Sequence, residues 1–239
     1  MVGMRMFGRA DRSPCEKGEG RSLASSKEKS GIKAPKLPKV LPPAALPGDM
    51  PAYGETYSQP EYQRLDLADS AIERLHFETV IFTQAILTST RFENLRLEDV
   101  RLAGCNLANA AWPKASCVRA EFIGCRMTGF ATQEAIFGDT IFRDCKLDLA
   151  QFYQVKMPGV RFEDSPLTGT DFRKSDLTGV AFVRCDLSNT DFTGATLAGA
   201  DLRGCQIDGM RAGPDELRGA IVDEVQALAL VRAMGITVE

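Results

Sequence analysis

An apolar residue recurs at every fifth position over most of this chain. From Tyr62 to Ile207, 29 of the 30 positions whose numbers end in 2 or 7 carry an apolar side chain, and Thr132 is the exception. The positions two residues earlier, from Leu65 to Cys205, are all uncharged and mostly small. Each group of five residues therefore supplies one large and one small residue to a common interior.

A period of five fits neither a helix, which repeats every 3.6 residues, nor a strand, which repeats every two. It predicts a chain that turns a corner every five residues. Residue types that tolerate positive φ recur two positions after the large apolar residue, where the corner is expected. They are Gly104, Asn109, Gly124, Gly129, Gly159, Gly169, Gly179, Asn189, Gly194, Gly199, Gly204 and Gly209.

Longer periodicities predict that four corners make one coil of 20 residues. Stacked coils place like residues above one another, and two kinds of residue share a 20-residue grid. The cysteines are Cys105, Cys125, Cys145, Cys185 and Cys205, with Ser165 in the missing place. The phenylalanines are Phe82, Phe122, Phe142, Phe162 and Phe182. We expect both sets to form interior columns, with the cysteines as reduced thiols whose role is packing.

Two places depart from this pattern. Phe130 and Thr132 exchange the large and small positions, and Pro166 lacks the amide that a central strand would donate. We therefore expect local irregularity around residues 127–137 and 156–166.

Segments such as SDLTG (175–179), CDLSN (185–189), TDFTG (190–194) and ADLRG (200–204) resemble the A(D/N)LXX signature of the pentapeptide-repeat family, in particular the loop-free relatives of the Qnr-type fluoroquinolone-resistance proteins. The resemblance covers residues 62–211. It implies an all-β fold, the right-handed quadrilateral parallel β-helix. At 20 residues per coil, this stretch would make about 7.5 coils, or ~36 Å of stacked strands.

The chain divides into three predicted parts. Residues 1–60 form a Pro/Ser/Lys-rich tail and an N-terminal cap, residues 61–222 the β-helix, and residues 223–239 a C-terminal capping and dimerisation helix. Residues 1–50 carry ten basic and five acidic residues, against nineteen and twenty-seven in residues 51–239. Because the tail has few large apolar side chains, we expect it to be disordered.

The C-terminal helix is predicted over residues 224–234. Asp223 can cap its first turn, Gln226 can complete a capping box, and Gly235 can end it. The helix is apolar nearly all round, more than is needed to cover the open end of a coil. The candidate cap and dimer residues are Val225, Leu228, Leu230, Val231 and Met234. We expect a homodimer through this helix.

The sequence favours no catalytic, cofactor or metal site. His76 is the single histidine and falls at an outward position, and no Cys-x-x-Cys pair, phosphate loop or dinucleotide fingerprint occurs. We therefore predict a protein that is not an enzyme and binds no cofactor. Neither a membrane-length apolar run nor a secretory signal is present, which predicts a cytoplasmic protein without membrane contact.

Two functions remain open at this stage. Qnr-type relatives bind DNA gyrase by imitating duplex DNA, which implies a continuous acidic face. The face around Phe82 and Phe162, however, carries five basic and five acidic residues, and the other three faces are balanced or only weakly acidic. We therefore favour a scaffold or interaction module with an unidentified protein partner and no direct contact with nucleic acid. DNA gyrase inhibition or protection is the alternative.

Overall fold

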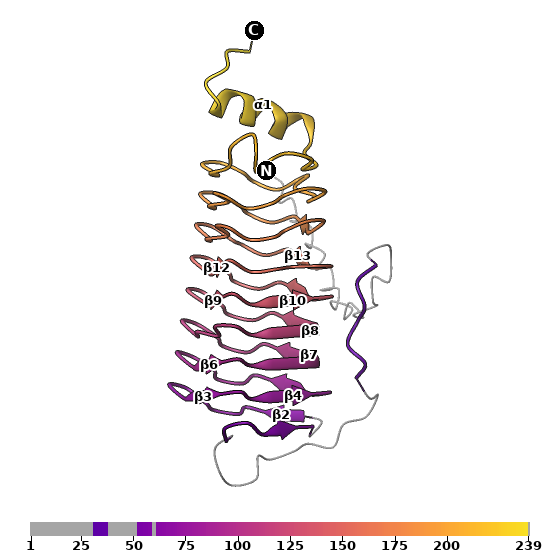
Figure 1. Ribbon diagram of the computed structural model, residues 1–239, viewed down its shortest axis with the longest axis vertical. Helices are drawn as coiled ribbons and strands as arrows, with labels where there is room; N and C mark the ends of the chain where they lie inside the picture. The colour runs from indigo at the N-terminus through magenta and orange to yellow at the C-terminus, as the bar shows by residue number, and fades with distance from the viewer. Residues whose placement is uncertain (1–30, 38–51, 59–60, 239) are drawn as a thin grey trace, which may run out of the picture. The chain divides into compact units, whose positions relative to one another are not determined.

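The computed structural model describes residues 31–37, 52–58 and 61–238. Residues Gly31–Glu239 form one compact unit, dominated by short strands that stack from coil to coil (Figure 1). The strands are β1 Thr56–Tyr57, β2 Glu61–Gln63, β3 Ala71–Glu73, β4 His76–Glu78, β5 Ile81–Thr83, β6 Arg91–Glu93, β7 Arg96–Ala103, β8 Ser116–Ile123, β9 Ala131–Gln133, β10 Ile136–Gly138, β11 Ile141–Arg143, β12 Gln151–Tyr153, β13 Arg161–Glu163 and β14 Ala181–Val183. One helix, α1 Glu224–Ala233, follows them.

Every strand pairs in parallel with the segment 20 residues further along the chain. Strand β11 pairs with β13 through Phe142 and Phe162, and β13 pairs with β14 through Phe162 and Phe182. The ladder begins with Thr56 opposite His76 and ends with Asp201 opposite Ile221. The predicted parallel β-solenoid is confirmed, and its ladder extends beyond both ends of the sequence repeat.

The corners lie where the sequence places them. Gly104 and Gly124 have φ of 62° and 60°, but Arg119 and Leu149 take the same conformation at 51° and 58°. A left-handed conformation costs such residues roughly 1–2 kcal/mol. Corner amides bond to the next coil, as the amide of Leu149 does to the Thr168 carbonyl at 3.0 Å. Stacking therefore imposes the corner on residues that do not favour it.

The interior contains the predicted aromatic column. The Phe162 ring stacks between Phe142 and Phe182, with centroid distances of 4.8 and 5.2 Å. It also meets the rings of Phe152 and Phe172 edge-on from the opposite side of the coil. All of these rings are fully buried. Such stacked and edge-on pairs add stability beyond the burial of their area.

The exchange at Phe130 and Thr132 is absorbed without a change of register. The Phe130 ring is fully buried and packs edge-on against Trp112 at 5.3 Å. The Thr132 hydroxyl donates to the Trp112 carbonyl at 2.8 Å, so its polar group is satisfied inside the core. Strand β9, which contains Thr132, still pairs with β12. The irregularity expected at residues 127–137 is therefore absent from the backbone ladder, because the two side chains compensate for each other.

Pro166 removes one bridge of the β-ladder but does not shift the register of the coils. Bridges join Arg126 to Lys146 and Pro166 to Asp186, whereas none is formed between Lys146 and Pro166 in the described part of the chain. The missing bridge follows from the missing proline amide. The Leu147 amide still donates to the Pro166 carbonyl at 2.9 Å, so the coil stays in register.

Candidate functional site

The outer face over β7, β8, β11, β13 and β14 carries paired charges of opposite sign. Arg101 bonds to Glu121 at 2.7 Å, Arg143 to Glu163 at 2.6 Å, Arg184 to Asp164 at 2.5 Å and Arg203 to Asp201 at 2.8 Å. Arg161 also pairs with Glu163. All five basic residues that the sequence assigned to this face thus have an acidic partner, either in the neighbouring coil or two residues away.

Two of these pairs lower the pKa of an aspartate and so favour its charged form. The hydrogen bond from Arg184 lowers the pKa of Asp164 below its usual value, and the partial burial of Asp164 opposes that shift. Likewise, the hydrogen bond from Arg203 lowers the pKa of Asp201 against the effect of burial. Asp164 and Asp201 are therefore charged near neutral pH, and the arginine beside each of them cancels that charge locally.

A second group of charges lies at the corner that separates β4 from β5. The same corner recurs every 20 residues in the later coils. Arg119 binds Asp99 with two hydrogen bonds of 2.7 and 2.8 Å and reaches Glu98 at 2.6 Å. Asp99 is buried, and its Oδ1 also accepts the Lys36 amide at 2.8 Å. Sequence reasoning did not single out this corner, because its residues look like ordinary outward charges until the chain segment around Lys36 is placed beside them.

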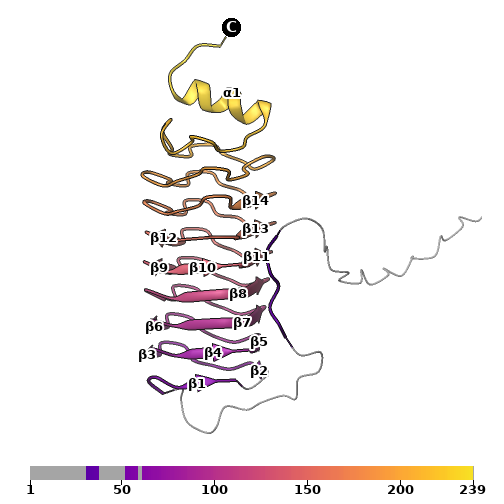
Figure 2. The same cartoon turned by 45° about the vertical axis from the view of Figure 1, so that its right-hand side comes forward.

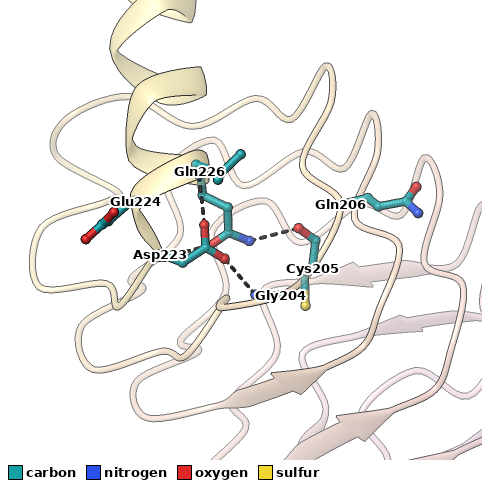
Figure 3. Close-up of a pocket in the computed structure, with 7 residues that line it drawn as sticks. Gly204, Cys205, Gln206, Asp223, Glu224 and Gln226 are labelled. Atoms are coloured by element: carbon teal, nitrogen blue, oxygen red, sulfur yellow. Dashed lines mark hydrogen bonds between the residues drawn. The ribbon is translucent and has the colours of Figure 1, made fainter.

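The C-terminal end of the solenoid is closed by the first turn of α1 (Figure 3). Asp223 accepts the Gln226 amide at 3.0 Å, and the Gln226 side chain accepts the Asp223 amide at 3.0 Å. The Gln226 Nε2 group donates to the carbonyls of Leu202 and Cys205 at 2.7 and 2.8 Å. The predicted capping box therefore also satisfies open carbonyls of the last coil.

The residue of α1 that is buried at this end is polar, whereas we expected apolar residues to cover it. Gln226 is the buried residue of α1. Leu230 and Val231 are half-buried, while Val225, Leu228 and Met234 are exposed, Val225 by 80%. A hollow of about 480 Å³ lies between the last coil and the helix, and its lining residues are Gly204, Cys205, Gln206, Asp223, Glu224, Val225 and Gln226 (Figure 3). The polar cap thus leaves the apolar residues of the helix in contact with solvent.

The cysteines of the 20-residue grid lie inside the solenoid. Cys105, Cys125, Cys145, Cys185 and Cys205 are all buried and free, and so is Cys117. For Cys125, a hydrogen bond with Cys105 lowers the pKa, but the Cys145 thiol and burial outweigh it and raise the pKa to about 12. Burial likewise raises the pKa of Cys117. The Cys117 and Cys125 thiols are therefore poor nucleophiles at neutral pH.

The described residues offer little for catalysis. His76 is half-buried in β4, and the described ranges hold no group of three or more His, Cys, Asp or Glu side chains that could bind a metal ion. A search of the same residues for a helix long and apolar enough to cross a membrane finds none. The described side chains form ion pairs and backbone caps.

Five-residue repeats that close into a parallel four-cornered solenoid define a distinct class of repeat protein. A family model described as a pentapeptide repeat region matches residues 115–189 and 135–211. Residues 115–211 therefore form a pentapeptide repeat region, as the sequence resemblance predicted.

Two solved structures show distant similarity to the chain. HetL, from the cyanobacterium Nostoc sp. strain PCC 7120, is 18% identical with a TM-score of 0.38, over 74% of this chain and 93% of its own. Full-length QnrB1, a plasmid-mediated fluoroquinolone resistance protein, is 18% identical with a TM-score of 0.34, over 77% and 97%. No curated protein matches the chain at a significant level.

Proposed function

We propose that this protein is a non-enzymatic scaffold or interaction module of the cytoplasm, which binds a partner protein through its outer faces. The observation that supports this proposal is the pairing of charges on the face over β7, β8, β11, β13 and β14. Alternating ion pairs give a surface that is specific at short range and nearly neutral at long range. Such a surface suits a protein partner with a complementary pattern of charges.

The alternative, binding to DNA gyrase by imitation of DNA, needs a continuous negative strip. Arg143 and Arg184 interrupt the acidic residues of this face, and both pair across adjacent coils. Opposite charges at contact distance cancel well within the ~8 Å screening length at physiological salt. Long-range attraction toward a basic DNA-binding saddle is therefore weak.

A gyrase supercoiling assay separates the two functions. We expect both the full-length protein and a variant without residues 1–50, whose net charge is +5, to leave supercoiling unchanged at low micromolar concentration. Half-inhibition at low micromolar concentration or below would replace the scaffold proposal with the gyrase one. A pull-down from native host extract, with the solenoid as bait, then identifies the partner.

We further propose that two copies associate through α1. Val225, Leu228 and Met234 are exposed in the single chain, which favours their burial against a second helix. Light scattering should give the mass of a dimer at micromolar concentration. Val225→Glu should split that dimer without harm to folding, because an acidic residue suits the first turn of a helix. Arg218→Glu, at an exposed position before the helix, is the control and should stay dimeric.

A further inference from the structure

A short segment from the predicted tail lies along one corner of the solenoid (Figure 2). The backbone amide of Lys36 donates to Asp99 Oδ1 at 2.8 Å, and the amide of Lys33 contacts Asp139 Oδ1 at 3.3 Å. Residues 31–37 have no helix or strand of their own. These seven residues therefore contact the corner as one extended segment, and they form no part of the β-ladder.

The distance between the two amides along the segment matches the distance between the two carboxylates along the solenoid. Asp99 and Asp139 occupy the same corner two coils apart, a rise of roughly 9.6 Å at the usual strand spacing. Lys33 and Lys36 are three residues apart, and three residues of polyproline II chain rise ~9.3 Å. An extended segment can thus present one amide to each carboxylate without bending, and Pro35, which has no amide, occupies a position where none is used.

The corner is complementary to the segment in charge and in polarity. Glu98, Asp99 and Asp139 outnumber Arg119, so the corner is acidic, while the segment carries two lysines with exposed side chains. Ile32, Pro35 and Leu37 are half-buried, in contrast to the lysines. The segment therefore turns apolar groups toward the protein and cations toward solvent.

Asp99 is held ready for this contact by Arg119. The two hydrogen bonds from Arg119 fix the carboxylate plane, and the Asp99 side chain is only 9% exposed. A buried carboxylate with a fixed direction binds an amide with less loss of freedom than a mobile surface one. The acceptor is therefore preorganised for the amide of Lys36.

The charged residues are confined to the coils that the segment crosses. At this corner, Asp99, Arg119 and Asp139 have φ of 54°, 51° and 49°, a conformation that glycine adopts more easily. The next four coils have glycine at the same corner: Gly159, Gly179, Gly199 and Gly219. The contrast links the carboxylates of this corner to the bound segment, since the corner itself can be made by glycine.

We propose that the corner formed by Asp99, Arg119 and Asp139 is a docking site for an extended, lysine- and proline-containing segment of a partner protein, and that residues 31–37 occupy it within the same chain. This inference rests on the proposed function as an interaction module and names one of its surfaces. Two amide contacts bind the segment only weakly. They suffice within one chain because the covalent link holds the segment near its site at an effective concentration in the millimolar range. A partner segment with more contacts can therefore displace residues 31–37.

Two proline variants of the full-length chain test the site. Lys36→Pro removes the amide that bonds to Asp99, whereas Ala34→Pro adds a proline where no amide contact is made and serves as the matched control. A fluorescein-labelled peptide of residues 30–38 is then titrated by fluorescence anisotropy. We expect the Lys36→Pro protein to bind it at least tenfold more tightly than the wild type or the Ala34→Pro protein, because its site is vacated.

Two further controls locate the binding. Asp139→Ala in the Lys36→Pro background should weaken peptide binding at least fivefold, and this exchange leaves the Asp99–Arg119 pair intact, so folding is preserved. A peptide with proline in place of Lys36 should not bind. Equal affinity of wild type and Lys36→Pro, no binding to either, or an Asp139→Ala effect below twofold overturns the docking site. The supercoiling and pull-down tests of the proposed function are independent of these results.

Discussion

The polar cap at the C-terminal end leads to a sharp prediction for Gln226. Its side chain is 5% exposed and serves as acceptor for the Asp223 amide and as donor to the Leu202 and Cys205 carbonyls. Gln226→Glu keeps the size and the acceptor but removes both donor bonds and directs a carboxylate at two carbonyl oxygens. With roughly 1 kcal/mol for each of the two lost bonds and ~1–3 kcal/mol for acceptors left unsatisfied, we expect the cap to lose about 3–5 kcal/mol.

Hydrogen exchange measures this loss where it occurs. Each coil of a solenoid contacts only its neighbours, so the cap can open while the central coils stay folded. We expect faster exchange of the Gly204 amide, which bonds to Asp223 at 3.0 Å, and of the Leu202 amide, which bonds to Ile221 at 2.9 Å. The amide of Phe152, in the middle of the solenoid, should be unaffected.

A neighbouring position supplies the control. Glu224 lies on the same turn of α1 and is exposed, so Glu224→Gln should change exchange at Gly204 by less than about 0.5 kcal/mol. If Gln226→Glu exchanges like Glu224→Gln, the carbonyls of the last coil do not depend on the Gln226 side chain, and the polar seal described above is wrong.

Three further predictions concern the interior and the corner. Phe162→Ala should cost about 3–5 kcal/mol in urea unfolding, because it leaves a cavity between two stacked rings, whereas Phe162→Leu should cost clearly less. Cys125 should react with a bulky thiol reagent at least about tenfold more slowly in the folded protein than in urea, and equal rates would contradict its inward position. The hydrogen bonds from Arg119 lower the pKa of Asp99 despite its burial, so this carboxylate stabilises the fold above about pH 4 and the contribution is lost as the pH falls through the lowered pKa. Asp99→Asn should reduce that acid dependence in denaturant titrations between pH 5 and 2, and an unchanged dependence would contradict the assignment.

Much of the fold could be predicted because the inward-facing residues recur at a constant spacing along the sequence. The recurrence of an apolar residue at every fifth position specifies the inward column, and the 20-residue grid of cysteines and phenylalanines specifies four sides to a coil. The capping residues of α1 could be predicted for a similar reason, since Asp223 and Gln226 act on backbone groups three residues away. Local chemistry of this kind depends on sequence spacing alone.

The corners were only partly predictable. Glycine and asparagine mark some of them, but Arg119 and Leu149 adopt positive φ because the coils on either side hold their backbone. Similarly, Pro166 removes one bridge but does not change the register, because the strands around it remain paired. Constraints from neighbouring coils overrule local preference in both cases.

The sequence by itself determined the period, the interior columns, the number of sides to a coil and the C-terminal helix, because each depends on spacing along the chain. Only the tertiary structure decided which charges neutralise one another and what covers each surface. It brought Arg184 to Asp164 across one coil, directed the Gln226 side chain at the open carbonyls of Leu202 and Cys205, and laid Lys36 against Asp99. These contacts join residues 20 or more positions apart, and they arise only when stacking brings distant parts of the chain to hydrogen-bonding distance.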